Sequence, residues 1–599
     1  MGMNAADYLC DRLAEWGIDT IYGFPGDGIN GILGALRRHQ EQLRFVQVRH
    51  EEQAAFMACG HAKFTDRVGV CMATSGPGAI HLLNGLYDAK LDHQPVLAIV
   101  GQTFAKAMGG DMQQEVDLLS LYKDVASAYV QQANDPSMIR HCLDRALRIA
   151  QAERTVTCVI VPADVQDMDA VPEQAPGLKA IHTGVGFARS RVLPETEDLE
   201  TAARVLNEGR RVAMLVGAGA LDAGEEVLAV ADKLGAGIAK ALLGKAVVPD
   251  DVPFCTGSIG LLGTKPSWDM MQEADTLLQV GSSFPYSNFL PPVGQAKGVQ
   301  IDLSPRMLSL RYPMEVNLVG DARATLQELL PLLLRKEDRS FQEKLVKGVD
   351  EWWQLMEERG KPEDRNGRIR PQGVFAAISR HLPDNAILSS DSGSAANWYA
   401  RQIRIRRGMM ASLSGNLATM IPGVPYAIAA KFAHPDRVSV AMVGDGAMQM
   451  GGMAELLTAA KYYRTWSDPR LVFLVLNNED LNQVTWEQRV MEGDPRFEAS
   501  QDIPYVPYYQ FAQMIGLEGI RLARAAEIED AVERAFAADR PVVLDAATDP
   551  EEPPLPPHIT FDQAVGFGRS FLEAPKAGAP GVVEAVREKV EQLRPGGAR

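Results

Sequence analysis

Two apolar runs in the last third of the chain each end in a short polar segment. The first run ends in Gly-Asp-Gly at residues 444–446, and the second ends in Asn-Asn at residues 477–478. Either fragment alone would be read as a turn or a strand cap. If both runs are buried parallel strands, their carboxyl ends meet in one crevice, which is where open α/β sheets bind ligands. Asp445 and Asn478 would then offer oxygen ligands to a hard cation such as Mg²⁺, with phosphate and water completing its shell.

The spacing of these two segments resembles the signature of thiamine diphosphate enzymes. The 30 residues between them are slightly more than is usual for that family, and residues 464–469 predict a small loop insertion that accounts for the excess. The resemblance implies that the side chains of Asp445 and Asn478 bind the metal, with the backbone carbonyl of Asp480 as a third ligand.

The composition is that of a large globular protein. Its 599 residues suffice for about three or four domains of roughly 150 residues each. The net charge of −17 argues against a nucleic-acid partner. The six cysteines are scattered without the spacing of a metal site, which favours a reduced, cytoplasmic protein. No signal peptide is recognisable, and no apolar run approaches the ~18 residues that span a bilayer.

Helix-like and strand-like stretches alternate along the chain in three blocks. These blocks cover residues 1–165, 198–335 and 369–550, and a tail follows at 551–599. A linker with several prolines precedes the second block, and a polar, charged connection at 335–368 follows it. Strands that alternate with helices predict α/β architecture, here three doubly wound parallel-sheet domains.

Glu51 lies where a strand-like run gives way to an alanine-rich helix. An acid at a helix start normally stabilises the helix dipole, and that would explain Glu51 in isolation. Two glycine-rich turns, at residues 22–28 and 74–78, follow other strand-like runs of the same block, so the three strand ends are expected to meet. This context favours a functional role for Glu51.

These turns, with Asn84-Gly-Leu-Tyr-Asp-Ala89, resemble the pyrimidine-binding domain of the pyruvate oxidase and acetolactate synthase family, and the resemblance runs from about residue 3 to 570. It implies that Glu51 hydrogen-bonds the aminopyrimidine ring of thiamine diphosphate and exchanges a proton with it. Gln114 would contact the substrate, although Gln113 replaces the family's aromatic residue. Glu52 is assigned a surface or structural role. The cofactor contacts implied in this block are Pro25, Gly26, Thr74 and Asn84.

The third block would hold the rest of the cofactor. Met420 would be the apolar wedge that bends thiamine diphosphate, and Ala418 would accept a hydrogen bond from its amine; ordinary core packing is the alternative for Met420. Val484 and Glu487 match substrate-pocket positions, whereas Asn482 and Gln483 depart from the residues usual in the oxidases. The further cofactor contacts implied here are Asp391, Gly393, Ser394, Gly444, Gly446 and Ala447.

The second block contains several glycine-rich turns after strand-like runs. Alone, each is weak evidence for a dinucleotide site. Together they resemble the FAD-binding domain of pyruvate oxidases, and the alternative is a flavin-free middle domain as in related decarboxylases. The implied FAD contacts are Gly217, Gly219, Gly257, Gly281, Phe284, Asp302 and Asp321.

The resemblance implies a thiamine diphosphate-, Mg²⁺- and FAD-dependent enzyme that oxidatively decarboxylates a 2-oxo acid, most simply pyruvate, through a hydroxyethyl enamine that reduces FAD. An acetolactate synthase-type carboligase with structural FAD, or a non-catalytic relative, are the alternatives. Since Glu51 and Asp445 lie in different domains, the family pattern implies a dimer core and a homotetramer. An apolar stripe at residues 582–593 could contact a membrane or quinone, but its acidic residues favour docking on the protein itself or disorder.

Overall fold

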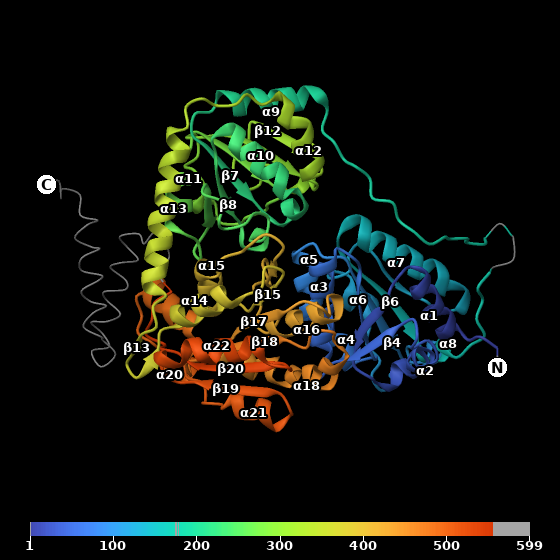
Figure 1. Cartoon of the computed structure of the whole chain (residues 1–599). Helices are drawn as coiled ribbons and strands as arrows, with labels where there is room; N and C mark the ends of the chain where they lie inside the picture. The colour runs from blue at the N-terminus through green and yellow to red at the C-terminus, as the bar shows by residue number, and fades with distance from the viewer. Residues whose placement is uncertain (1, 174–176, 178, 555–599) are drawn as a thin grey trace.

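The computed structural model describes residues 2–173, 177 and 179–554. Three α/β domains follow one another along the chain, and each is built on a six-stranded, wholly parallel sheet with helices on its faces (Figure 1). This confirms the predicted fold class. The tail beyond residue 554, including the apolar stripe at 582–593, lies outside the described residues.

In the first domain the strand order is β2-β1-β3-β4-β6-β5. Its strands are β1 (Thr20–Gly23), β2 (Arg44–Gln47), β3 (Gly69–Ala73), β4 (Val96–Gln102), β5 (Val130–Gln132) and β6 (Val156–Pro162). Its helices are α1 (Ala5–Glu15), α2 (Asn30–Arg38), α3 (Glu51–Thr65), α4 (Pro77–His81), α5 (Leu83–Leu91), α6 (Leu118–Tyr122), α7 (Ile139–Glu153) and α8 (Ala163–Gln166). The chain order reverses between β1 and β3, which makes their carboxyl ends the expected ligand crevice.

In the middle domain the order is β12-β11-β10-β7-β8-β9. The strands are β7 (Val212–Val216), β8 (Gly237–Lys240), β9 (Cys255–Ser258), β10 (Thr276–Val280), β11 (Lys297–Asp302) and β12 (Val316–Val319), and the helices are α9 (Thr196–Glu208), α10 (Gly224–Leu234), α11 (Lys265–Glu273), α12 (Ala322–Leu329) and α13 (Ser340–Arg359). Numbered within the domain, this is the 3-2-1-4-5-6 order of dinucleotide-binding folds, with its switch point between β7 and β10.

The third domain repeats the strand order of the first, as β16-β15-β17-β18-β20-β19, beside a small antiparallel pair. Its strands are β13 (Asp364–Arg365), β14 (Arg368–Ile369), β15 (Ile387–Ser390), β16 (Met410–Ser412), β17 (Ser439–Gly444), β18 (Leu471–Asn477), β19 (Glu518–Leu522) and β20 (Val542–Ala547). Its helices are α14 (Pro371–His381), α15 (Ser394–Gln402), α16 (Gly423–Ala433), α17 (Asp445–Ala447), α18 (Met453–Tyr462), α19 (Asn482–Glu487), α20 (Glu498–Gln501), α21 (Tyr508–Met514) and α22 (Ile528–Ala537).

The first and third domains share one hydrophobic core. Helices α3 and α16 pack against each other there, and both are buried on nearly every face. Close approach requires small residues, because a Cβ at Gly60 of α3 would lie only 2.9 Å from the ring of Tyr426 on α16. Helices buried on nearly every face belong in an interior, and these two form the junction of the domains (Figure 1).

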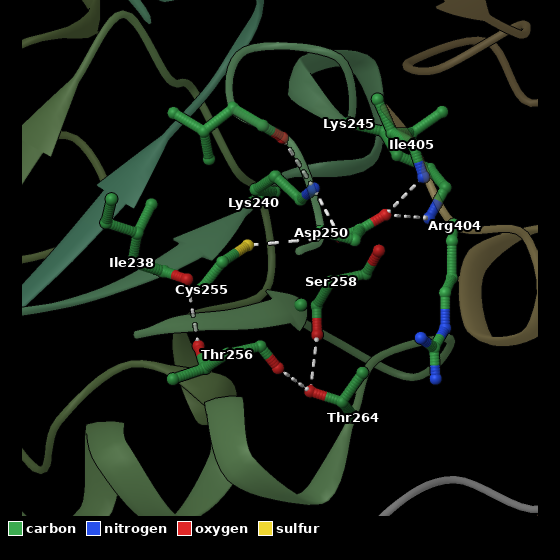
Figure 2. Close-up of polar contacts among 12 residues, drawn as sticks. Ile238, Lys240, Lys245, Asp250, Cys255, Thr256, Ser258, Thr264, Arg404 and Ile405 are labelled. Carbon is green, nitrogen blue, oxygen red and sulfur yellow. Dashed lines mark hydrogen bonds and ion pairs between the residues drawn. The ribbon is translucent and has the colours of Figure 1, made fainter. Parts of the chain in front are cut away.

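A buried ionic cluster joins the middle domain to the third (Figure 2). Asp250 pairs with Lys240 at 2.5 Å and lies 3.7 Å from Lys245, and all three side chains are almost fully buried. The other carboxylate oxygen of Asp250 accepts a hydrogen bond from the backbone N–H of Ile405, and Lys245 donates to the carbonyl of Ala400. The cluster therefore links the end of β8 and the loop after it to α15 and to the segment that follows this helix.

Two connecting segments are more ordered than the sequence analysis indicated. The polar connection at residues 335–368 contains the 20-residue helix α13, which buries Phe341, Leu345, Val349, Trp352 and Met356 along one face. The predicted loop insertion at 464–469 precedes β18, and it is anchored because Trp466 is buried and its ring contacts that of Phe432 edge-on at 5.7 Å. None of the described helices is both long enough and apolar enough to cross a membrane.

Candidate cofactor and metal site

Asp445 stands at the carboxyl end of β17, directly beside the end of β18. The two strands pair in register up to Gly444 and Leu476. One carboxylate oxygen of Asp445 accepts hydrogen bonds from the backbone N–H groups of Asn478 and Glu479, at 2.7 and 2.6 Å, and the other accepts from Gly446 at 2.9 Å. Burial raises the pKa of Asp445 to about 7, against the lowering effect of those bonds. The side chains of Asp445 and Asn478 thus form an oxygen donor set of the kind Mg²⁺ prefers.

The side chain of Asp480 is fully engaged within the protein. Its carboxylate accepts hydrogen bonds from Thr485 and Asn482 and forms an ion pair with Arg496 at 3.0 Å. The amide of Asp480 donates to the side-chain oxygen of Asn478 at 3.1 Å. The side chain of Asp480 is thus held by protein groups, and its backbone carbonyl is the atom that the sequence resemblance implies as a metal ligand.

We call the carboxyl ends of β15, β17 and β18, where Asp445 and Asn478 lie, the metal corner. Glycines at this corner leave space that a ligand could fill. No described atom lies within 4 Å of a Cβ built on Gly444, whose backbone is ordinary extended chain, so protein packing does not explain a glycine there. Gly393, which has φ +90° and precedes α15, has only the Cβ of Gln483 at 4.0 Å. Gly444 is the last residue of β17, and Gly393 and the buried Ser394 follow the neighbouring strand β15. The switch point of this sheet lies between these two strands. Open backbone at a switch point fits a diphosphate group.

Met420 reaches this corner from the segment after β16. A Cβ on Gly446 would meet the Met420 methyl at 3.2 Å and Leu481 at 2.6 Å. We call residues 414–421 the Met420 segment. Ala418 and Ile421 within it have positive φ angles of +53° and +95°. Ala418 is exposed and Met420 half-buried, so both are accessible beside the metal corner.

The carboxylate of Asp391 joins two segments of the site. It is completely buried and accepts hydrogen bonds from the backbone N–H groups of Ser392 and Ile421. Asp391 thus links the turn that leads to Gly393 with the Met420 segment. Burial raises the pKa of Asp391 to about 7.

Glu51 begins α3 and is buried. One oxygen lies 2.9 Å from Nδ1 of His81, and the His81 ring stacks on that of His50 with centroids 4.4 Å apart. The other oxygen lies 3.1 Å from where a Cβ on Gly78 would stand, so the turn after β3 leaves no room for a larger residue beside Glu51. The carboxylate therefore faces the turn as predicted, with a histidine partner that the sequence alone did not indicate.

The glycine-rich turns of the first domain meet as expected. A Cβ on Gly26, which follows the exposed Pro25, would lie 2.5 Å from Thr74, and Thr74 accepts a hydrogen bond from the amide of Gly28 at 2.9 Å. Gln114 lies over the turn after β3: its side chain accepts a hydrogen bond from Ser75 at 3.0 Å, and its φ is +62°.

Asn84 connects the two domains. Its side-chain amide donates to Glu52 at 2.6 Å and to the hydroxyl of Thr419, in the Met420 segment, at 3.2 Å. Within the described part of the chain, however, no hydrogen bond or ion pair links Glu51 with Asp445, Asn478 or Met420. Within one chain, therefore, the carboxylate of Glu51 does not contact the residues that would bind the metal.

Helix α19 carries the predicted substrate residues. Val484 is half exposed, and Glu487 accepts a hydrogen bond from Gln483, whose carbonyl in turn accepts from Asn397 on α15. Asn482 is buried and donates hydrogen bonds to Asp480 and to the carbonyl of Pro550, so its side chain helps to hold the loop that contains Asp480. Ala447 is buried within α17.

The glycines of the middle domain are explained by the protein itself. Gly217 and Gly281 end β7 and β10 at the switch point, and the amide of Gly219 donates to the carbonyl of Gly281 at 2.9 Å. Side chains on these glycines would collide with backbone 2.4–2.8 Å away. Gly257 has φ +97° and faces Thr264. These glycines therefore give no independent sign of a flavin.

The remaining predicted flavin residues have structural partners as well. Asp321 caps α12 by accepting from the amide of Ala324, and Asp302 at the end of β11 accepts from that of Ser304. Burial raises the pKa of Asp302. Phe284 is buried against Gly260 and contacts the half-exposed Tyr286 edge-on. Two features of this domain fit a dinucleotide: the strand order, and the carboxylate of Asp302 at the edge of the sheet formed by the carboxyl ends of the strands.

Comparisons with known proteins agree with this geometry. Residues 3–121, 199–329 and 391–546 match the N-terminal TPP binding, central and C-terminal TPP binding domains described for thiamine pyrophosphate (thiamine diphosphate) enzymes. The chain is 36% identical over 570 residues to the putative thiamine pyrophosphate-containing protein YdaP of Bacillus subtilis, covering 95% of this chain and 96% of that protein.

Two further relatives carry different activities in their names. A pyruvate oxidase from Lactiplantibacillus plantarum is 28% identical over 92% of this chain and 90% of its own length, and an acetolactate synthase large subunit from Corynebacterium glutamicum is 30% identical over 91% and 86%. On the three matched domains and these relatives, the chain belongs to the thiamine pyrophosphate enzyme family, in the branch that contains pyruvate oxidases and acetolactate synthases.

Proposed function

We propose that this protein is a Mg²⁺- and FAD-dependent thiamine diphosphate enzyme that oxidatively decarboxylates a 2-oxo acid, with pyruvate as the first candidate. The observation that carries the cofactor part is the open corner at Gly444, bounded by Asp445, Asn478 and Met420. The dinucleotide-type strand order of the middle domain and the similarity to a pyruvate oxidase support the flavin part.

The chain's own residues would divide the work between the two halves. Asp445, Asn478 and the carbonyl of Asp480 would hold the metal, and Met420 would set the shape of the bound cofactor. Glu51, fixed by His81, would give and take a proton at the aminopyrimidine ring. When bound, thiamine diphosphate supplies a nucleophilic carbon and an electron sink for decarboxylation, and FAD supplies an acceptor for two electrons. Gln114, Val484 and Glu487 would contact the substrate.

A carboligase is the second candidate, because acetolactate synthases are also among the relatives. In that case a second keto acid would be the acceptor and FAD would remain oxidised. Purified protein given pyruvate without oxygen separates the two. Loss of the flavin absorbance near 450 nm without acetolactate supports the oxidase, whereas acetolactate formation with the absorbance retained overturns it.

We further propose a homodimeric core, completed to a homotetramer, in a reducing cytoplasm. Glu51 and Asp445 make no direct contact within one chain, so Glu51 of a second chain would complete the site that contains Asp445 of the first. The six cysteines, all in the described part of the chain, are buried and form no disulfide. Sedimentation of the purified protein tests the assembly, and a stable monomer that still binds thiamine diphosphate would refute it.

A further inference from the structure

One face of α5 and its C-cap carries three polar residues at four-residue spacing, Asn84 and Asp88 within the helix and Asp92 at the C-cap. Residues four apart lie on the same side of a helix. All three side chains contact the Met420 segment or the residues that flank it, although α5 belongs to the first domain and that segment to the third. The face is therefore a polar contact between the two domains, beside the apolar core that they share.

Asp92 binds the start of the Met420 segment. Its carboxylate accepts hydrogen bonds from the backbone N–H groups of Gly415 and Asn416, at 2.9 and 2.8 Å. Lys63 of α3 neutralises it at 2.6 Å and also donates to the carbonyl of Leu413 at 2.5 Å. Asp92 and Lys63 are both nearly inaccessible to solvent, so these charge-assisted bonds are of the strong kind.

Asp88 acts on the same segment through Ser414. The Ser414 hydroxyl donates to Asp88 at 2.6 Å and accepts a hydrogen bond from the amide of Thr419 at 3.1 Å. The second oxygen of Asp88 accepts from the hydroxyl of Tyr426 on α16. Asp88 is fully buried, so its carboxylate depends on these partners.

The segment held in this way has an unfavourable backbone. Ile421 has φ +95°, which is a rare conformation for a β-branched residue. It is kept there because its amide donates to both carboxylate oxygens of Asp391, at 2.9 and 3.0 Å. Such a conformation persists only where the surroundings fix it at more than one point. The contacts from α5 at one end and Asp391 at the other supply those points.

We propose that Asp88 and Asp92 are positioning residues that hold the Met420 segment in its strained form, so that Met420 stands against Gly446 before the cofactor arrives. The site is then prepared in the apoprotein, and binding does not have to order this loop. The proposal deepens the proposed function, on which it rests only through the binding of thiamine diphosphate. It makes no claim on whether the reaction is an oxidation or a ligation.

The variants Asp88→Asn, Asp92→Asn and Ser414→Ala test the proposal. Ser414→Ala breaks the relay to Thr419 and is the mildest of the three. Asp144→Asn is the matched control, because Asp144 is a fully buried carboxylate of the first domain, paired with Arg12 at 2.6 Å, that makes no contact with the segment. Hydrogen exchange of peptides covering residues 413–421 is measured in the apoprotein, and thiamine diphosphate affinity is measured by calorimetry with Mg²⁺.

We expect Asp88→Asn, Asp92→Asn and Ser414→Ala each to exchange about tenfold faster over 413–421 and to bind the cofactor about tenfold more weakly, as loss of a buried charged hydrogen bond implies. Asp144→Asn should lower the melting temperature without either change. Unaltered exchange in a folded Ser414→Ala or Asp92→Asn protein, or an equal effect of Asp144→Asn, would overturn the proposal. Because exchange is read without cofactor, failure of the wild type to bind thiamine diphosphate would refute the proposed function separately.

Discussion

Glu455 of α18 accepts a hydrogen bond from the backbone N–H of Arg49 at 2.6 Å, so a buried carboxyl group of the third domain contacts the chain two residues before Glu51. Burial raises the pKa of Glu455 to about 7, in spite of that bond and the nearby charge of Arg49. The group that steadies the start of α3 therefore changes its charge near neutral pH.

This gives a pH dependence with a definite sign. The folded pKa of Glu455 is raised, so the folded chain binds more protons than the unfolded chain between about pH 4.5 and 7. The stability that this group contributes is full below pH 4.5 and is lost as pH rises through 7, by up to roughly 3 kcal/mol. Glu455→Gln, which resembles the protonated acid, should lose less stability between pH 5 and 8 than the wild type in urea unfolding. Parallel curves for the two proteins would contradict this assignment.

Gly444→Ala should separate stability from cofactor binding. A methyl group there meets no described atom within 4 Å and needs no unusual backbone, so the apoprotein should melt within about 1 °C of wild type. The same methyl group would fill the space assigned to the diphosphate, and affinity for thiamine diphosphate should fall about tenfold or more, ~1.4 kcal/mol. Gly348→Ala on α13, which is equally free of close atoms, is the control and should bind normally. Normal binding by Gly444→Ala would place the diphosphate elsewhere.

Glu51→Gln should remove catalysis and preserve the fold. The substitution keeps the shape beside His81 but cannot exchange a proton with the aminopyrimidine ring, and general acid–base groups of this kind contribute roughly 10²–10⁴ in rate. We expect kcat with pyruvate to fall at least about a hundredfold with little change in melting temperature. A variant that retains most of its activity would support the non-catalytic alternative.

The cluster in Figure 2 predicts a stabilising substitution. Asp250 lies closer to Lys240 than to Lys245, and burial lowers the pKa of Lys245 to about 8. Because the folded chain then binds fewer protons than the unfolded one between pH 8 and 10.5, wild-type stability should rise over that range. Lys245→Met should not show this rise and should be more stable at pH 7, by roughly 2 kcal/mol.

Lys240→Met is the matched comparison for that substitution. It removes the nearer cation from a buried carboxylate, and breaking a buried pair in this way typically costs about 3–5 kcal/mol. Thermal melts at pH 7 of the two variants should therefore shift in opposite directions. Destabilisation of equal size in both would show that the carboxylate is shared evenly between the two lysines.

The proximity of Asp445 and Asn478 could be predicted from sequence because each residue follows an apolar run. The carboxyl ends of parallel strands lie at the same edge of a sheet, so residues that follow such strands come close together. Gly26 and Thr74 likewise meet because β1 and β3 are neighbours. At Asp391 the sequence indicated the turn, but it could not indicate that the carboxylate would also accept a hydrogen bond from the amide of Ile421.

Contacts between distant segments were beyond sequence reasoning. Nothing in the chain indicates that Ser414 will meet Asp88, or that His81 will meet Glu51, because neither pair shares a periodic pattern. Helix α13 is different: Phe341, Leu345, Val349, Trp352 and Met356 follow a helical repeat that was visible among its charged neighbours. The reason for the glycines at Gly217 and Gly281 could not be read from the sequence. Glycines needed for backbone packing look the same in sequence as glycines that bind a phosphate.

The mutual burial of α3 and α16 has a consequence for how this protein can be handled. An excised fragment 1–165 would carry α3 with its alanine, phenylalanine and cysteine surface turned to water, and a fragment beginning near 369 would do the same with α16. Large uncovered apolar surfaces of this kind drive aggregation. Neither the first nor the third domain is therefore expected to remain folded and unaggregated as an isolated recombinant fragment. Any natural division of this architecture into separate genes would require the two products to be made together.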